Sequence, residues 1–149
     1  MESGGNIIIT HDHWTLLEIQ GNSAICSSLL KAKLISRLGA NKSKARILNN
    51  SHPIFNSYYN LNFQKNDLIE IAETHRSCTT YDDMKEYLND FLIQLDDDEH
   101  GEYLLIKEIG KGRLIYWNAG HLYRYYGSFR NITEIEQKIF MNIIYWIFE

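Results

Sequence analysis

The chain has little proline, little cysteine and no linker-like composition. Its 149 residues include one proline and two cysteines, Cys26 and Cys78. No Gly/Ser-rich or Pro-rich stretch separates two parts, and no internal repeat occurs, so a single domain over residues 1–149 is expected. The sparse cysteines, with an N-terminus that lacks the basic start and long apolar core of a secretion signal, predict a reducing, intracellular environment.

Long apolar runs and a surplus of positive charge are absent as well. The most apolar segment, residues 138–149, has roughly ten residues of unbroken apolar character, against about twenty needed to cross a bilayer. We therefore expect no transmembrane span. The net charge of -4 excludes a polycation that coats nucleic acid by charge alone, while 44% hydrophobic and 13% aromatic residues provide for a real core.

Alternating and β-rich runs predict strands in much of the chain. Residues 7–19 and 23–30 suggest a hairpin through Gly21-Asn22, and KAKLISRLG (31–39) and KARIL (44–48) suggest further short strands. EYLLIKEIGKGRLIYW (102–117) reads as another hairpin around Gly110-Lys111-Gly112.

Three segments are predicted to be helical. Residues 67–75 follow Asn66, a candidate N-cap. Residues 80–95 begin with Thr80 and Asp83 at capping-box spacing, and apolar residues recur every three or four positions before the acidic run 96–99. From Asn118 onward the pattern is helical again. One face of this C-terminal helix carries Ile132, Ile135, Ile139, Ile143 and Ile147, which predicts packing on its own domain.

Three stretches resemble one known family. HDHWTLLEIQGNSAIC (11–26) resembles its H-box, NNSHPIFNSYYNLNFQKNDLIEIAE (49–73) its middle segment, and NAGHLYRYYG (118–127) its NC box. This is the H-box/NC family, which includes the HRAS-like suppressor and lecithin:retinol acyltransferase proteins and the non-protease 2A proteins of picornaviruses, parechoviruses especially. The resemblance implies an α+β fold of the permuted papain-like type, an antiparallel β-sheet packed against helices, with an insertion at about 77–115.

The resemblance places the catalytic base on His13, the nucleophilic cysteine on Ala119 and the second H-box histidine on Cys26. Asn118 and His121 become structural residues of the NC box. A Cys-His dyad attacks a carbonyl through its thiolate, and alanine has no atom for that step. The chain as written is therefore expected to be catalytically silent, whether the cysteine was lost naturally or replaced. The alternative is a thiol-dependent acyltransferase or phospholipase whose natural chain carries cysteine in place of Ala119.

Other chemistry at these residues is less well supported by the sequence. Cys78 precedes a predicted helix, but no His-aromatic pair follows it, and Cys26 on a strand also reads as a small buried hydrophobe. His11 and His13 share a strand face, yet no third or fourth ligand stands at a recognisable spacing. We therefore expect no metal and no cofactor.

A basic stretch offers a function of another class. Residues 31–46 contain six cations and no acid: Lys31, Lys33, Arg37, Lys42, Lys44 and Arg46. They could contact RNA phosphates, with tyrosines as stacking partners, or form a solvated strand edge that discourages pairing. The resemblance to 2A proteins favours RNA or host-protein binding in viral replication, in the host cell cytoplasm. Membrane-surface contact through the C-terminal helix has weaker support, because its polar face carries little positive charge.

Overall fold

A mixed β-sheet with one long helix across it forms the centre of the molecule. The computed structural model describes residues 4–10, 32–34, 42–74, 78–80, 91–96, 101–119 and 132–149. The strands in these ranges are β1 (Gly5–Thr10), β2 (Ala32–Leu34), β3 (Lys42–Ile47), β4 (Leu68–Thr74), β5 (Cys78–Thr80), β6 (Phe91–Leu95), β7 (Glu102–Ile109) and β8 (Gly112–Trp117). The helices in the same ranges are the short 3-10 helix η2 (Pro53–Phe55) and the α-helix α3 (Glu134–Phe148).

The six-stranded sheet has the order β1-β8-β7-β6-β3-β4, and β2 and β5 form a separate two-stranded sheet. β1 runs parallel to β8, with Ile8 opposite Ile115, while the other neighbours in the large sheet are antiparallel. β7 and β8 form the predicted hairpin, whose turn contains Gly110 at a φ of 60°, a conformation that glycine adopts without strain. Of the strand expected at 31–39, residues 32–34 are described, as β2, and the strand expected at 44–48 is β3, which begins two residues earlier than predicted.

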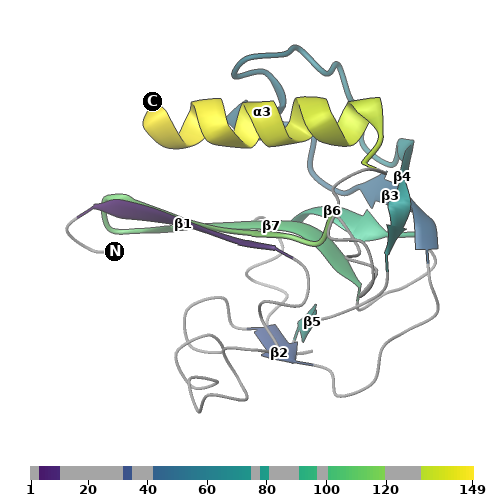
Figure 1. The fold of residues 1–149 in the computed structure, drawn as a ribbon, viewed down its shortest axis with the longest axis horizontal. Coiled ribbons are helices and arrows are strands. Elements are labelled where there is room, and N and C mark those ends of the chain that lie inside the picture. The colour runs from purple at the N-terminus through teal and green to yellow at the C-terminus, as the bar shows by residue number, and fades with distance from the viewer. Residues whose placement is uncertain are drawn as a thin grey trace.

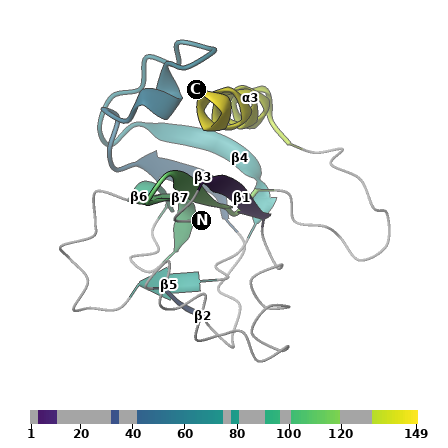
Figure 2. The ribbon, with the colours of Figure 1, turned by 90° about the vertical axis from the view of Figure 1, so that its left-hand side faces the viewer.

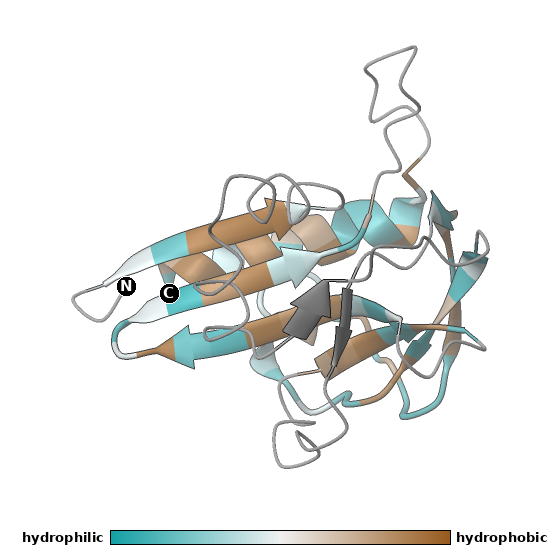
Figure 3. Ribbon diagram, turned by 90° about the horizontal axis from the view of Figure 1, so that it is seen from below, coloured by the Kyte–Doolittle hydropathy of each residue, from teal (hydrophilic) through white to brown (hydrophobic). Residues whose placement is uncertain are grey.

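Described elements lie on both sides of the sheet (Figures 1 and 2). α3 lies along one face, and the β2–β5 pair lies on the opposite side. This explains why β7 is buried continuously from Glu102 to Ile106 instead of alternating between buried and exposed positions. The brown, apolar middles of the strands in Figure 3 follow the same pattern.

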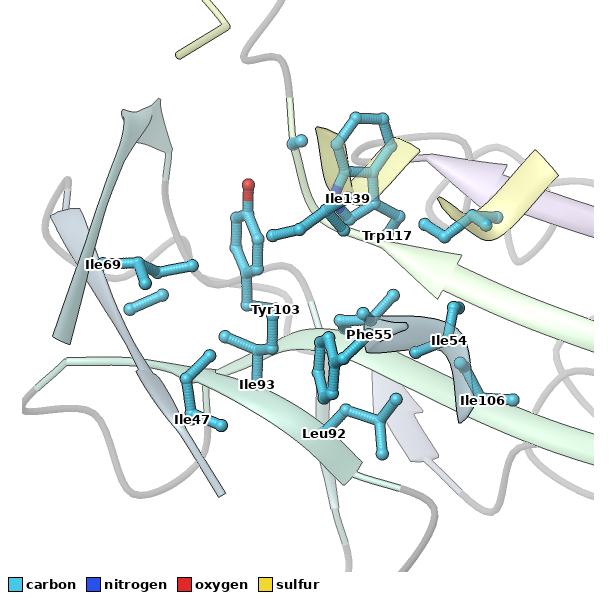
Figure 4. Close-up of a cluster of buried hydrophobic side chains, with 14 of the residues drawn as sticks. Ile47, Ile54, Phe55, Ile69, Leu92, Ile93, Tyr103, Ile106, Trp117 and Ile139 are labelled. Carbon is cyan, nitrogen blue, oxygen red and sulfur yellow. The ribbon is translucent and has the colours of Figure 1, made fainter. Parts of the chain in front are cut away.

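The core lies mainly between the sheet and α3. Ile139, Ile143 and Trp146 point inward from the helix and are almost fully buried, as the isoleucine pattern predicted. They meet Trp117 and Tyr103 from the sheet within one continuous cluster, part of which Figure 4 shows. Each such side chain contributes about 1.5–3 kcal/mol by leaving water, so this helix is stabilised chiefly by its packing.

The α+β class is confirmed, but two predicted helices are wrong. Residues 68–74 form β4, in which buried Ile69 and Ile71 alternate with exposed Leu68 and Glu70. Asn66, expected as an N-cap, adopts a φ of 72° in the turn before this strand. Glu70 and Glu73 occupy outward positions of this half-buried strand.

The second wrong helix ends in β6. Phe91, Leu92 and Leu95, expected on one helical face, belong to a strand that is buried on both faces and pairs with β3 and β7. Thr80, the expected cap, lies in β5, and residues 81–90 are outside the described residues. A short continuous apolar run fits a buried strand as well as a helix, so periodicity could not decide here. The segment expected as an insertion, 77–115, thus contributes β6 and β7 to the middle of the sheet.

The C-terminal helix begins later than expected. Asn118 and Ala119 follow β8 in a non-helical conformation, and α3 starts at Glu134 with Thr133 as its N-cap. Thr133 and Glu136 form a reciprocal capping box, which satisfies backbone donors of the first turn. Of the hairpin expected across residues 7–30, only residues 7–10 are described, as the end of β1, because residues 11–31 lie outside the described residues.

Candidate functional site

The end of β8 carries the two NC-box residues that the structure describes. Asn118 is fully buried, its backbone N–H donates to the Tyr103 carbonyl over 2.8 Å, and its side-chain oxygen accepts a 3.3 Å hydrogen bond from the Thr74 hydroxyl. Thr74 ends β4, which lies at the far edge of the sheet from β1. The sheet therefore curls enough to bring the ends of β4 and β8 together. The hydrogen bond between Thr74 and Asn118 joins these two ends.

Ala119 follows directly and is buried as well. Only 3% of its surface is exposed, and it belongs to the same hydrophobic cluster as Trp117 and Ile139. An alanine methyl group has no nucleophilic atom, and this one is almost fully buried. The position at which the resemblance expects a reactive thiol is thus part of the packing between sheet and helix.

The remaining predicted catalytic and NC-box residues lie outside the described residues. These are His13, Cys26 and His121. Cys78 lies in β5, paired opposite Leu34, so it is on a strand and not at a helix start as the sequence suggested. Asn118 and Ala119 are therefore the only predicted members of this site whose surroundings can be described.

A buried acidic anchor at the start of α3 was not expected from the sequence. Glu136 of α3 is fully buried and accepts hydrogen bonds from the backbone N–H groups of Ala72 and Thr133, at 2.8 and 2.7 Å, and from the Tyr103 hydroxyl at 2.5 Å. One carboxylate thus joins β4, β7 and the start of the helix. Its oxygens are occupied by these donors and closed off from water, so we assign it a structural role and no catalytic one.

The burial of this pair and the charge of Glu136 change the pKa of the Tyr103 hydroxyl. Burial, and then the charge and hydrogen bond of Glu136, raise the pKa of Tyr103 well above its ordinary value of 10.0. A neutral hydroxyl is therefore retained as a donor to the carboxylate. The sequence did hold a signal for this anchor, since Thr133 and Glu136 stand at capping-box spacing before the isoleucine pattern.

The basic stretch is described in part, and its charges are partly compensated. Lys31 and Arg37 lie outside the described residues, and only the backbone of Lys33 is described, in β2. On β3, Lys44 lies 3.4 Å from Glu70, and Arg46 lies 2.6 Å from Asp96. β3 is bonded to β4 on one side and to β6 on the other, so the strand-edge alternative is wrong for this part of the stretch.

Aromatic side chains gather on the surface beside α3. Tyr58 contacts Tyr59 and Tyr145 with ring centroids 4.8 and 5.3 Å apart, and these three rings remain 39–54% exposed. Buried Asn142 fixes this arrangement, because its side chain bonds the backbone N–H groups of Tyr58 and Tyr59 and the carbonyl of Tyr59. His52 of the same loop accepts from the Ile54 N–H and packs against Trp146.

The described residues contain no cluster of three or more His, Cys, Asp or Glu that could hold a metal ion. Among them, no helix is both long and apolar enough to cross a bilayer. No protein-family model matches the chain, and no curated protein matches its sequence.

Proposed function

We propose that this chain is a catalytically silent protein of the H-box/NC type, of the 2A kind, which acts in viral replication by binding RNA or a host protein. The observation that carries the proposal is Ala119. At the position that the resemblance gives to the nucleophile stands a methyl group, 3% exposed and packed into the core. With no thiol and no open surface there, binding is the function that the residues still support.

The choice between the two partners turns on the basic stretch. Lys44 and Arg46 alternate with buried Ala45 and Ile47 and so project from one face of β3, which suits a row of phosphates. Their pairing with Glu70 and Asp96 cancels part of that charge and favours a protein partner. RNA binding through this stretch would then depend most on the cations outside the two ion pairs.

An Ala119→Cys variant tests catalytic silence. The variant and the parent chain are exposed to a thiol-reactive acyl ester, and the acylated residue is located by mass spectrometry, so that Cys26 and Cys78 give the background. We expect the introduced thiol to react no faster than an ordinary cysteine, because residue 119 is buried. Rapid acylation that His13→Ala abolishes would contradict the proposal and favour the acyltransferase or phospholipase alternative.

Charge reversal in the basic stretch tests RNA binding. Lys33→Glu/Lys42→Glu, which reverses two cations outside the two ion pairs, should weaken association with a single-stranded RNA oligonucleotide and lower the slope of log K against log salt, by about 0.7 for each lost phosphate contact. The matched control is Lys65→Glu/Lys111→Glu, which makes the same charge change at exposed positions outside the stretch. Equal losses in both variants, or none in either, would reject this surface as the RNA site and leave a protein partner.

A further inference from the structure

The helix α3 is apolar on its inner face and also over the C-terminal half of its outer face. Its inner face packs on the sheet, yet Met141, Tyr145 and Phe148 point outward with exposed fractions of 42%, 49% and 81%. Together with Glu134 and Lys138 they form a row with alternating spacings of four and three residues, which we call the outer stripe. This is the spacing of the seam along which two helices pack, and the sheet does not use it.

Two exposed tyrosines of the loop after η2, Tyr58 and Tyr59, extend the apolar surface of the outer stripe. Tyr58 and Tyr59 are 54% and 39% exposed, and Tyr58 lies against Tyr145. The exposed area of these aromatic rings, Met141 and Phe148 comes to roughly 500 Å², near the top of the range of about 300–600 Å² for the largest apolar patch of a monomer. The largest apolar patch of a monomer is often functional, so this surface is a candidate interface.

The charged residues of the outer stripe, and Glu149 at its end, indicate which class of partner it can bind. Glu134 and Lys138 form an ion pair of 2.6 Å near its start, and Glu149 is exposed at its end. Two acids and one base, on a chain of net charge -4, do not attract RNA phosphates or anionic lipid. The surface therefore suits a protein.

We propose that the outer stripe binds a second copy of this chain, with the two α3 helices antiparallel. In that arrangement Met141 of each copy faces Tyr145 of the other, and Phe148 faces Lys138. The Lys138 ammonium then reaches Glu149 of the second copy, whereas a parallel pair would place like charges together. The outer stripe is thus complementary to itself in one orientation only.

The area agrees with a modest dimer. Pairing two such patches buries about 1,000 Å², the lower limit for a specific interface. A concentration-dependent monomer–dimer equilibrium is therefore expected, and not an obligate dimer. This inference does not depend on the proposed function, because it involves neither Ala119 nor the basic stretch.

Sedimentation equilibrium of the full chain over a wide concentration range tests the proposal. We expect the parent chain to dimerise, Tyr145→Glu to weaken the dimer at least tenfold, and Ile7→Glu to leave it unchanged. Ile7 is a matched control, since it is 45% exposed on β1 and neighbours Ile8, whose side chain points to the opposite, core face. A monomeric parent chain at every soluble concentration, or equal effects of both substitutions, would overturn the proposal.

A charge exchange tests the antiparallel orientation. Lys138→Glu and Glu149→Lys should each weaken the dimer, and the double variant should recover most of the loss, with helix content checked by circular dichroism. Absence of recovery would overturn the antiparallel arrangement. Flotation with phosphatidylcholine vesicles distinguishes a lipid surface, because Tyr145-dependent flotation of a monomeric chain would overturn the dimer in favour of the membrane.

Discussion

The two ends of α3 are attached to the sheet by different means. At the N-terminal end, the fully buried Glu136 binds donors from β4, β7 and the helix cap. At the C-terminal end, Arg113 of β8 stacks over Trp146 at 4.2 Å and donates to its carbonyl, and Asn6 of β1 donates to the Ile147 carbonyl over 2.8 Å. The helix consequently crosses the sheet from the β4 side to the β1 side (Figure 1).

Both attachments complement the helix dipole, but they differ in their access to water. An acid at the N-terminus and a cation at the C-terminus are each favourable. The Arg113 side chain keeps 23% of its surface exposed, whereas Glu136 keeps none. Water can replace a lost hydrogen bond at the exposed end, and it cannot do so at the buried end. The N-terminal attachment should therefore be the more costly to break.

The largest effect is expected for Glu136→Ala. The substitution leaves the N–H groups of Ala72 and Thr133 and the Tyr103 hydroxyl without their acceptor in a buried place, at about 1–3 kcal/mol for each unsatisfied group. Allowing for partial relaxation, we expect a loss of about 4 kcal/mol in the free energy of unfolding, measured by urea denaturation.

Glu134→Ala is the matched control for this prediction. Glu134 lies in the same turn but is fully exposed, and its carboxyl pairs with Lys138 at the surface, so the urea midpoint should not move. Similar shifts for the two variants would mean that the helix dipole, and not the buried anchor, dominates this end.

A smaller effect is expected for Tyr103→Phe, about 1.5–3 kcal/mol at neutral pH, because one hydrogen bond to a charged group is lost. Since the folded pKa of Tyr103 lies above its ordinary value of 10.0, the hydroxyl stabilises the fold fully below pH 10.0. This contribution declines as the pH rises further, because the unfolded state loses the proton first.

The role of the Tyr103 hydroxyl can be measured from the pH dependence of the free energy of unfolding. Above pH 10.0 the parent chain should lose stability more steeply than Tyr103→Phe, by up to about 1.4 kcal/mol per pH unit, in urea denaturation at successive pH values. Tyr59→Phe, which alters a partly exposed ring, should keep the slope of the parent chain. Identical slopes in all three proteins would contradict the buried phenol–carboxylate pair.

Elements with a long or turn-bounded sequence pattern could be predicted, and elements with a short apolar run could not. The β7–β8 hairpin was predictable because two strand-like runs flank a glycine-containing turn, and α3 because its isoleucines repeat over four turns. β4 and β6 were not, since a short run such as Phe91–Leu95 acquires its strand character from β3 and β7, which pair with it on either side. Local propensity contains no information about those neighbours.

The candidate site was predictable to a smaller extent. Residue type alone excludes a nucleophile at Ala119, but its burial depends on how α3 packs on the end of β8. The roles of Glu136 and Asn142 depend on contacts with residues 64 and 83 positions away in the chain. A polar residue within an apolar helical face indicates a buried partner without identifying it.

The smallest effect is expected for Arg113→Lys. Lysine keeps the positive charge near the end of α3 but loses the planar stack on Trp146, so the free energy of unfolding should fall by about 1 kcal/mol. Lys111→Ala, in the exposed turn beside it, should change nothing measurable.

Hydrogen exchange of the α3 amides in Arg113→Lys compares how easily the two ends of the helix open. In Arg113→Lys the amides around Trp146 should exchange faster, while those of the turn held by Glu136 should keep their rates, because a partly hydrated attachment can open alone. Faster exchange along the whole helix would show that its two ends open together. Opening of the Arg113 end would then also break the hydrogen bonds of Glu136.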